Sequence, residues 1–139
     1  MTPKYLWEIG SCILILLGAI HLYYTFLTNK FSSDNQTLMA AMKTSFMLLT
    51  KQTTIWKAWI GFNASHSMGV IFIGIVNFYL AVNYFAIFET DVFFFLFTIS
   101  VVAFYVWLAK KYWFKIPFTG LVIAFICYIV SGILVFTTG

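Results

Sequence analysis

Two histidines are the side chains in the apolar part of this sequence that are best suited to bind a ligand or move a proton. His21 and His66 both lie in long apolar stretches, where polar side chains are costly and usually face the interior of a helical bundle. Each histidine belongs to a row of polar and small residues at helical spacing. The first row is Ser11, Gly18, His21, Thr25 and Thr28, and the second is Asn63, His66, Ser67, Val70, Gly74 and Asn77.

The depths of the two histidines allow them to share one site. At about 1.5 Å per residue, His21 lies about 9 Å from the end of its apolar stretch and His66 about 16 Å from the start of the next one. Consecutive membrane helices are antiparallel, so the two rows can face each other. The predicted ligand-binding residues are His21, Thr25, Asn63, His66, Ser67 and Asn77.

Several kinds of chemistry fit these residues. The imidazoles can tie helices together by bonding neighbouring hydroxyls, amides or carbonyls. They can also orient the polar head of a lipophilic small molecule, such as a quinone or a lipid. Paired histidines can ligate haem, and a proton relay or a metal site is a further possibility.

The scarcity of acids limits catalysis. A catalytic zinc usually has three protein ligands, but the apolar stretches supply two histidines, no deep carboxylate and two separated thiols. Cys12 and Cys127 lie at different depths, so we expect no disulfide between them. We therefore predict neither a catalytic residue nor a metal site, and a non-enzymatic protein is expected over an enzyme.

The composition shows which class of protein must hold these residues. Of the 139 residues, 63% are hydrophobic and 9% are charged, whereas soluble domains have about 25% charged residues. This excludes a soluble globular domain, a disordered chain and a disulfide scaffold. The net charge of +4 is spread over the connections, which argues against a nucleic-acid partner. A polytopic membrane protein remains, with the lipid bilayer as its first partner.

Four apolar stretches are long enough to cross a bilayer, which takes about 20 residues. Because backbone groups in lipid must be satisfied within the segment, each stretch is predicted to be a helix. The expected fold is all-α, a four-transmembrane-helix bundle that forms a single membrane domain over residues 1–139. The predicted spans are residues 6–27, 55–85, 92–112 and 117–137.

The connection between the first two spans is too long for a simple turn. Ser33 and Gln36 have the form of a capping box, and apolar residues then recur at helical spacing at Leu38, Met42 and Phe46. We therefore predict a short amphipathic helix over residues 34–49, lying in the membrane interface. A lid over a pocket that opens from the cytoplasmic leaflet is the functional alternative.

The lysines predict the orientation. Only Lys4 lies on the side of the termini, and all other lysines flank the first and third connections. Basic connections stay in the cytoplasm, so both termini are expected outside, in a multi-pass protein of the bacterial cytoplasmic (inner) membrane. The cytoplasmic lysines would be Lys30, Lys43, Lys51, Lys57, Lys110, Lys111 and Lys115.

Three segments of the chain resemble a known sequence signature. They are residues 56–67, with the sequence W-K-A-W-I-G-F-N-A-S-H-S, residues 18–25 and residues 30–34. They resemble a signature of an uncharacterised family of small bacterial four-helix integral membrane proteins of about 140 residues. The resemblance covers the chain to about Gly74. It implies a four-helix membrane fold and no particular activity, and it favours a role for the region around His21 and His66.

Three functions follow as hypotheses. The first is a protein that binds a lipophilic small molecule at the histidines. The second is a non-catalytic accessory or assembly subunit, whose partner would be another membrane protein or a second copy in a homo-oligomer. The third is a b-type haem electron carrier, with haem as the cofactor.

Overall fold

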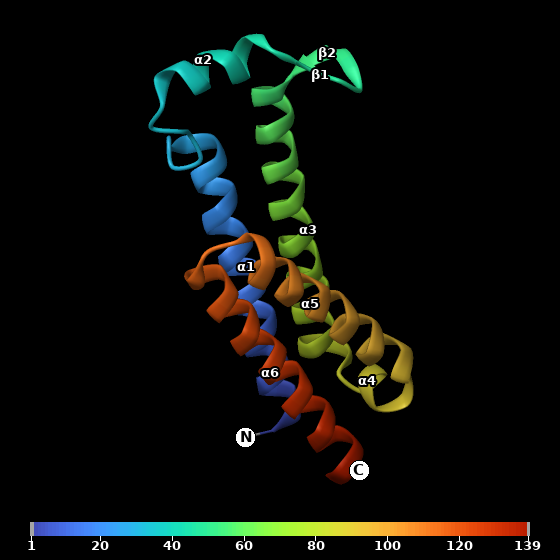
Figure 1. Ribbon diagram of the computed structural model, residues 1–139. Coiled ribbons are helices and arrows are strands. Elements are labelled where there is room, and N and C mark those ends of the chain that lie inside the picture. The colour runs from blue at the N-terminus through green and yellow to red at the C-terminus, as the bar shows by residue number, and fades with distance from the viewer. Residues whose placement is uncertain (1, 139) are drawn as a thin grey trace. The chain divides into compact units, whose positions relative to one another are not determined.

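The computed structural model describes residues 2–138, and most of them are helical (Figure 1). Two short strands form an antiparallel hairpin in the first long connection. The fold is therefore all-α, as the apolar stretches predict. The helices are α1 (Pro3–Leu27), α2 (Gln36–Thr44), α3 (Ile55–Tyr84), α4 (Ile87–Thr90), α5 (Val92–Tyr112) and α6 (Lys115–Thr138), and the strands are β1 (Phe46–Met47) and β2 (Thr50–Thr54).

Among the described residues, four helices are long and apolar enough to cross a membrane, namely α1, α3, α5 and α6. The chain is thus a multi-pass membrane protein. The predicted span 92–112 coincides with α5, and α3 ends one residue before the predicted 85. Helix α6 begins at Lys115, two residues early, and keeps Pro117 in its first turn, where backbone N–H groups have no partner within the helix.

The amphipathic helix of the first connection is present but shorter than the predicted 34–49. Its N-cap is Asn35 rather than Ser33, because the Asn35 side chain accepts the backbone N–H of Leu38 at 3.1 Å. The helix ends at Thr44, and the chain then turns back on itself as β1 and β2. The prediction is therefore wrong for residues 45–49. Strand β2 contains three threonines, whose branched side chains favour extended backbone.

The structure divides into two compact units. The bundle unit comprises residues 2–17 and 70–138 of the described chain, and the histidine unit comprises residues 18–69. Helices α1 and α3 contribute to both units. A single membrane domain stays a prediction.

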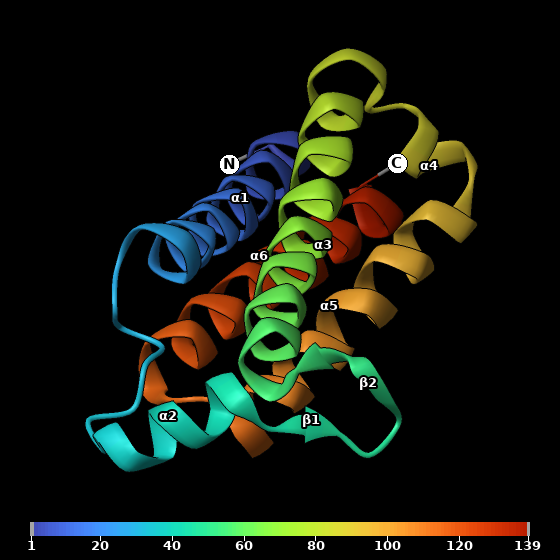
Figure 2. The same ribbon diagram turned by 90° about the horizontal axis from the view of Figure 1, so that it is seen from above.

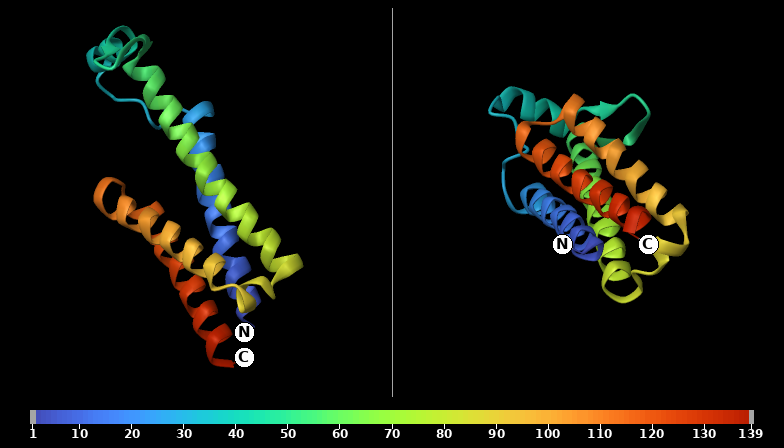
Figure 3. Two further views of the ribbon diagram at one scale, coloured as in Figure 1. Left: turned by 90° about the vertical axis from the view of Figure 1, so that its right-hand side faces the viewer. Right: turned by 90° about the horizontal axis from the view of Figure 1, so that it is seen from below.

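The bundle unit contains parts of all four long helices, and α5 and α6 lie side by side within it (Figure 3). The Lys4 side chain donates to the backbone carbonyl of Val82 at 3.0 Å. Ser131 donates to the backbone carbonyl of Pro3 at 2.7 Å. The start of α1 therefore lies at the same end of this unit as the last turns of α3 and α6, as an even number of crossings requires.

Trp7 is the largest buried side chain of the bundle unit, at 1% exposed. Its ring centroid lies 4.3 Å from that of Phe88 and 4.7 Å from that of Tyr128. Its indole N–H donates to Asn77 Oδ1 at 3.1 Å, and the hydroxyl of Thr98 donates to the same oxygen at 2.9 Å. We call Trp7, Asn77 and Thr98 the Asn77 network. It joins α1, α3 and α5 through one buried amide.

A close contact between α1 and α3 gives a first prediction. A Cβ atom on Gly74 would lie 2.7 Å from the Ile15 side chain and 3.0 Å from the backbone oxygen of Ser11. Because backbone cannot move aside cheaply, Gly74→Ala should destabilise the protein by about 1–3 kcal/mol, as overpacking typically does. The measurement is the thermal unfolding midpoint in detergent.

The matched control is Gly61→Ala on the same helix. Nothing lies within 4 Å of a Cβ atom at Gly61, so this variant should unfold at the wild-type temperature or slightly higher, since alanine favours helix by about 1 kcal/mol over glycine. Equal midpoints for the two variants would contradict the close approach of α1 and α3 at Gly74.

The histidine unit holds the end of α1, the long connection and the first half of α3. Figure 2 shows α2 and the β1–β2 hairpin beside the start of α3. The backbone N–H of Ile55 donates to the carbonyl of Ser45 at 3.0 Å. The first turn of α3 is thus anchored to the residue that precedes the hairpin.

Candidate ligand-binding site beside two histidines

His21, Asn63 and His66 form the polar centre of the histidine unit. His21 comes from α1, and the other two come from α3. His21 Nε2 lies 3.0 Å from Asn63 Oδ1, and the two imidazole centroids are 5.6 Å apart at an interplanar angle of 63°. We call these three residues the histidine cluster. The structure thus brings together the two histidines that the sequence predicts to share a site.

The hydrogen bonds determine which nitrogen of His21 carries a proton. Asn63 Nδ2 donates to the backbone carbonyl of Trp59 at 2.8 Å, which orients the amide so that Oδ1 faces His21. An amide oxygen only accepts hydrogen bonds, so His21 Nε2 must be the donor. In a neutral ring, His21 Nδ1 is then the acceptor nitrogen.

Two predicted residues hold the cluster indirectly. The hydroxyl of Thr25 donates to the backbone carbonyl of His21, and that of Ser67 donates to the backbone carbonyl of Asn63, both at 2.8 Å. Both side chains are buried, at 5% and 0% exposed. Each hydroxyl thus donates its proton to the carbonyl one turn earlier on its own helix, and neither hydroxyl donates to a neighbouring side chain of the cluster.

Phe31 is a part of this site that the sequence pattern missed. Its ring centroid lies 4.6 Å from that of His21, and its backbone carbonyl accepts the indole N–H of Trp59 at 3.2 Å. The residues after α1 therefore fold back against α3 and cover one side of the cluster. The available signal was an aromatic residue between two polar neighbours, Lys30 and Ser32.

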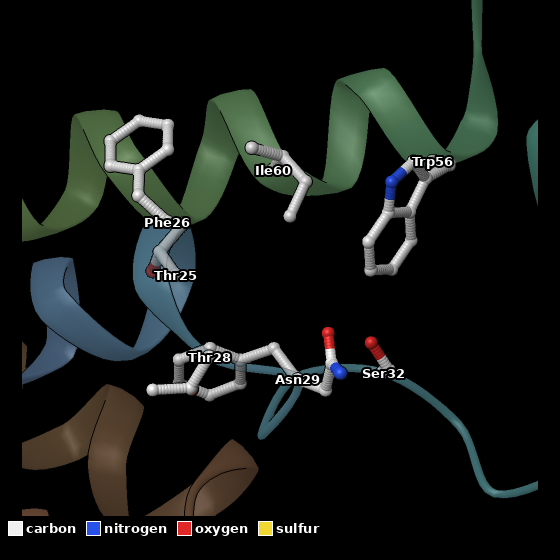
Figure 4. A pocket seen from close by; sticks show the side chains of 8 residues that line it. Thr25, Phe26, Thr28, Asn29, Ser32, Trp56 and Ile60 are labelled. Atoms are coloured by element: carbon white, nitrogen blue, oxygen red, sulfur yellow. The ribbon is translucent and has the colours of Figure 1, made fainter.

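A pocket of about 270 Å³ lies next to the histidine cluster. Phe31 joins the two, because its ring contacts His21 and also lines the pocket. Figure 4 shows Asn29 and Ser32 on the connection, facing Trp56 and Ile60 of α3 across the opening. The polar lining residues are Thr25, Thr28, Asn29 and Ser32, and the apolar ones are Phe26, Phe31, Trp56 and Ile60.

Asn77 has a different role from the other five predicted site residues. It belongs to the bundle unit, where its amide bonds Trp7, Thr98 and the backbone carbonyl of Ile73. It follows His66 by eleven residues in the sequence. A continuous polar row on α3 therefore serves two separate environments.

The donor set of the site suits hydrogen bonding. Among residues 2–138, no group of three or more His, Cys, Asp or Glu side chains is arranged to hold a metal ion. Ligation of haem iron by His21 through Nε2 would break its bond to Asn63. The pocket instead combines amide and hydroxyl groups with aromatic and aliphatic side chains. This arrangement suits a molecule with one polar end and an apolar ring or chain.

Neither a protein-family model, nor a curated protein, nor a solved structure matches the chain. The resemblance of residues 56–67 to a family of small bacterial membrane proteins therefore stays a prediction. What supports a function is the geometry of the histidine cluster and its pocket.

Proposed function

We propose that this protein binds a lipophilic small molecule, a quinone or a lipid, in the bacterial inner membrane. The observation that carries the proposal is the pocket of about 270 Å³ that adjoins the histidine cluster through Phe31. Sites for small molecules are concave and mostly apolar, with a few fixed polar groups, and they start at about 300 Å³. This pocket lies just below that lower limit, and half of its lining residues are polar, so it suits a small polar head group rather than a whole lipophile.

The side chains suggest how such a molecule would be held. An apolar ring would lie between Phe31 and Trp56, while Asn29 and Ser32 would bond its polar oxygens. Asn63 would fix the imidazole of His21 beside Phe31, because its amide accepts a hydrogen bond from His21 and donates one to the Trp59 carbonyl. No acidic side chain lines the pocket, so the proposed role is binding rather than acid–base catalysis.

The lysines support an orientation for this proposal. With seven lysines on the two expected cytoplasmic connections and Lys4 on the other side, both termini would lie outside. The pocket lies at the end of α1 and the start of α3, and it would then open near the cytoplasmic face. A lipophile could reach it from the inner leaflet.

The test is to purify the protein in mild detergent and identify bound small molecules by extraction and mass spectrometry. We expect a stoichiometric lipophile with the wild type and about tenfold less with Ser32→Ala, because Ser32 lines the pocket and one hydrogen bond to a ligand is worth about 1.5 kcal/mol. Ser65→Ala is the control, since the Ser65 hydroxyl donates to the backbone carbonyl of Phe62 on its own helix and Ser65 does not line the pocket. Wild-type protein without any bound lipophile would refute the proposal.

A second candidate function is that of a non-catalytic accessory or assembly subunit. It is favoured by the Asn77 network and by the bond between Ser11 and Tyr128 at 2.9 Å, which use polar residues for helix packing. Crosslinking in native membranes should then trap a specific membrane protein or a second copy of the chain. A b-type haem carrier is the third candidate, and an absorption spectrum without a Soret band would exclude it.

A further inference from the structure

An apolar groove of about 580 Å³ lies in the histidine unit, on residues that the proposed ligand pocket does not use. Its walls come from α2, the β1–β2 hairpin and the start of α3. All of its lining side chains are apolar. The side chains that carry the argument are Met42, Phe46, Leu48, Leu49, Ala58 and Trp59.

The hairpin turn indicates the medium that surrounds this groove. Leu48 and Leu49 occupy the turn and are 109% and 88% exposed. Turns that face water are usually made of Gly, Asn, Asp, Pro or Ser, and adjacent exposed leucines are costly there. A turn with two leucines suits contact with lipid acyl chains, and Trp59 on the groove wall suits a membrane interface.

The charge around the groove indicates the chemistry of its occupant. Each of the three elements that form the groove carries one lysine: Lys43 in α2, Lys51 in β2 and Lys57 in α3. Residues 36–62 contain no acidic side chain. Cationic side chains around an apolar groove complement a molecule with an anionic head and an acyl chain.

We propose that this groove binds an anionic phospholipid of the surrounding bilayer. One acyl chain lies along Met42, Phe46 and Trp59, and the Leu48–Leu49 turn enters the same leaflet. The lysines of α2, β2 and α3 hold the phosphate group at the membrane surface. The inference goes beyond the proposed function, because it concerns a separate set of lining residues and a structural lipid.

The test uses the full-length protein in mild detergent and native mass spectrometry. Phosphatidylglycerol and phosphatidylcholine with identical acyl chains are titrated separately. We expect retention of phosphatidylglycerol at lower concentration than phosphatidylcholine. The triple variant Lys43→Gln, Lys51→Gln, Lys57→Gln should lose about a hundredfold in affinity for phosphatidylglycerol, since each lysine near an anionic lipid contributes about fivefold.

Two further variants separate charge from shape. A second triple variant should keep the wild-type affinity, because it removes the same charge from the bundle unit. Its substitutions are Lys110→Gln, Lys111→Gln and Lys115→Gln. Ala58→Phe fills the groove without changing charge, and it should weaken binding of both lipids. Circular dichroism confirms that each variant is folded.

Three outcomes would overturn the proposal. The first is equal retention of the two lipids by the wild type. The second is unchanged affinity in the variant that lacks Lys43, Lys51 and Lys57. The third is occupation of the groove by a second copy of the chain or by another protein, detected as a complex that Ala58→Phe abolishes. Loss of the lipophile from Ser32→Ala with normal phosphatidylglycerol binding would keep this site distinct from the ligand pocket.

Discussion

Asn77→Leu should lower the free energy of unfolding by about 2–4 kcal/mol. Asn77 Oδ1 accepts two buried donors, the Trp7 indole N–H at 3.1 Å and the Thr98 hydroxyl at 2.9 Å. Leucine has nearly the shape of asparagine but no acceptor, and each buried donor left without a partner costs about 1–3 kcal/mol. Water is absent from the bilayer core and cannot replace the lost oxygen.

The measurement is unfolding of the purified protein in mixed micelles with increasing denaturing detergent, followed by tryptophan fluorescence. Asn83→Leu is the matched control on the same helix, because Asn83 is exposed and its side chain donates to the backbone carbonyl of Tyr79 on its own helix. The control should unfold close to the wild-type midpoint. If Asn77→Leu were as stable as Asn83→Leu, the Asn77 network would contribute nothing to the bundle unit.

The second large effect concerns orientation. Alkaline phosphatase fused after Gly139 should be active, because this reporter folds only outside the cytoplasm and the lysine distribution predicts an external C-terminus. The same reporter fused after Phe114, between α5 and α6, should be inactive. The contrast is close to all-or-none, since a reporter domain is either exported or retained.

A reporter that is active in the cytoplasm serves as the complement. Green fluorescent protein fused after Phe114 should fluoresce. The same protein fused after Gly139 should not fluoresce, because it is exported unfolded. Activity of both phosphatase fusions would indicate mixed orientation, and the reverse pattern would refute the proposed topology. Neither result would alter the finding that the start of α1 and the end of α6 lie at one end of the bundle unit.

The sequence predicts the long helices well, because an apolar stretch in lipid has few alternatives to helix. The starts and ends of α1, α3, α5 and α6 differ from the predicted spans by three residues or fewer. The polar rows also predict the meeting of His21 with Asn63 and His66, because helical spacing and antiparallel neighbours leave few other arrangements.

Two features could not be derived from the pattern. Leu38, Met42, Phe46 and Leu49 fit the helical period, so the spacing of apolar residues does not show that the helix ends at Thr44, and the threonines of β2 were the one available signal for the hairpin. The row from Asn63 to Asn77 covers fifteen residues, and periodicity does not reveal that its two ends have different neighbours. The first failure concerns local strand pairing and the second concerns tertiary contacts, and the spacing of apolar residues contains neither.

The bond between Ser131 and Pro3 has a consequence for the order in which the protein is made. Helix α6 is synthesised last, yet it supplies Tyr128 and Ser131 to the first turns of α1. During translation α1 enters the membrane long before these partners are synthesised. The Trp7 indole N–H likewise has no Asn77 acceptor until α3 is made. Membrane helices insert first and associate afterwards. A chain whose synthesis stops before α6 would therefore hold an inserted α1 that lacks its contacts to Tyr128 and Ser131.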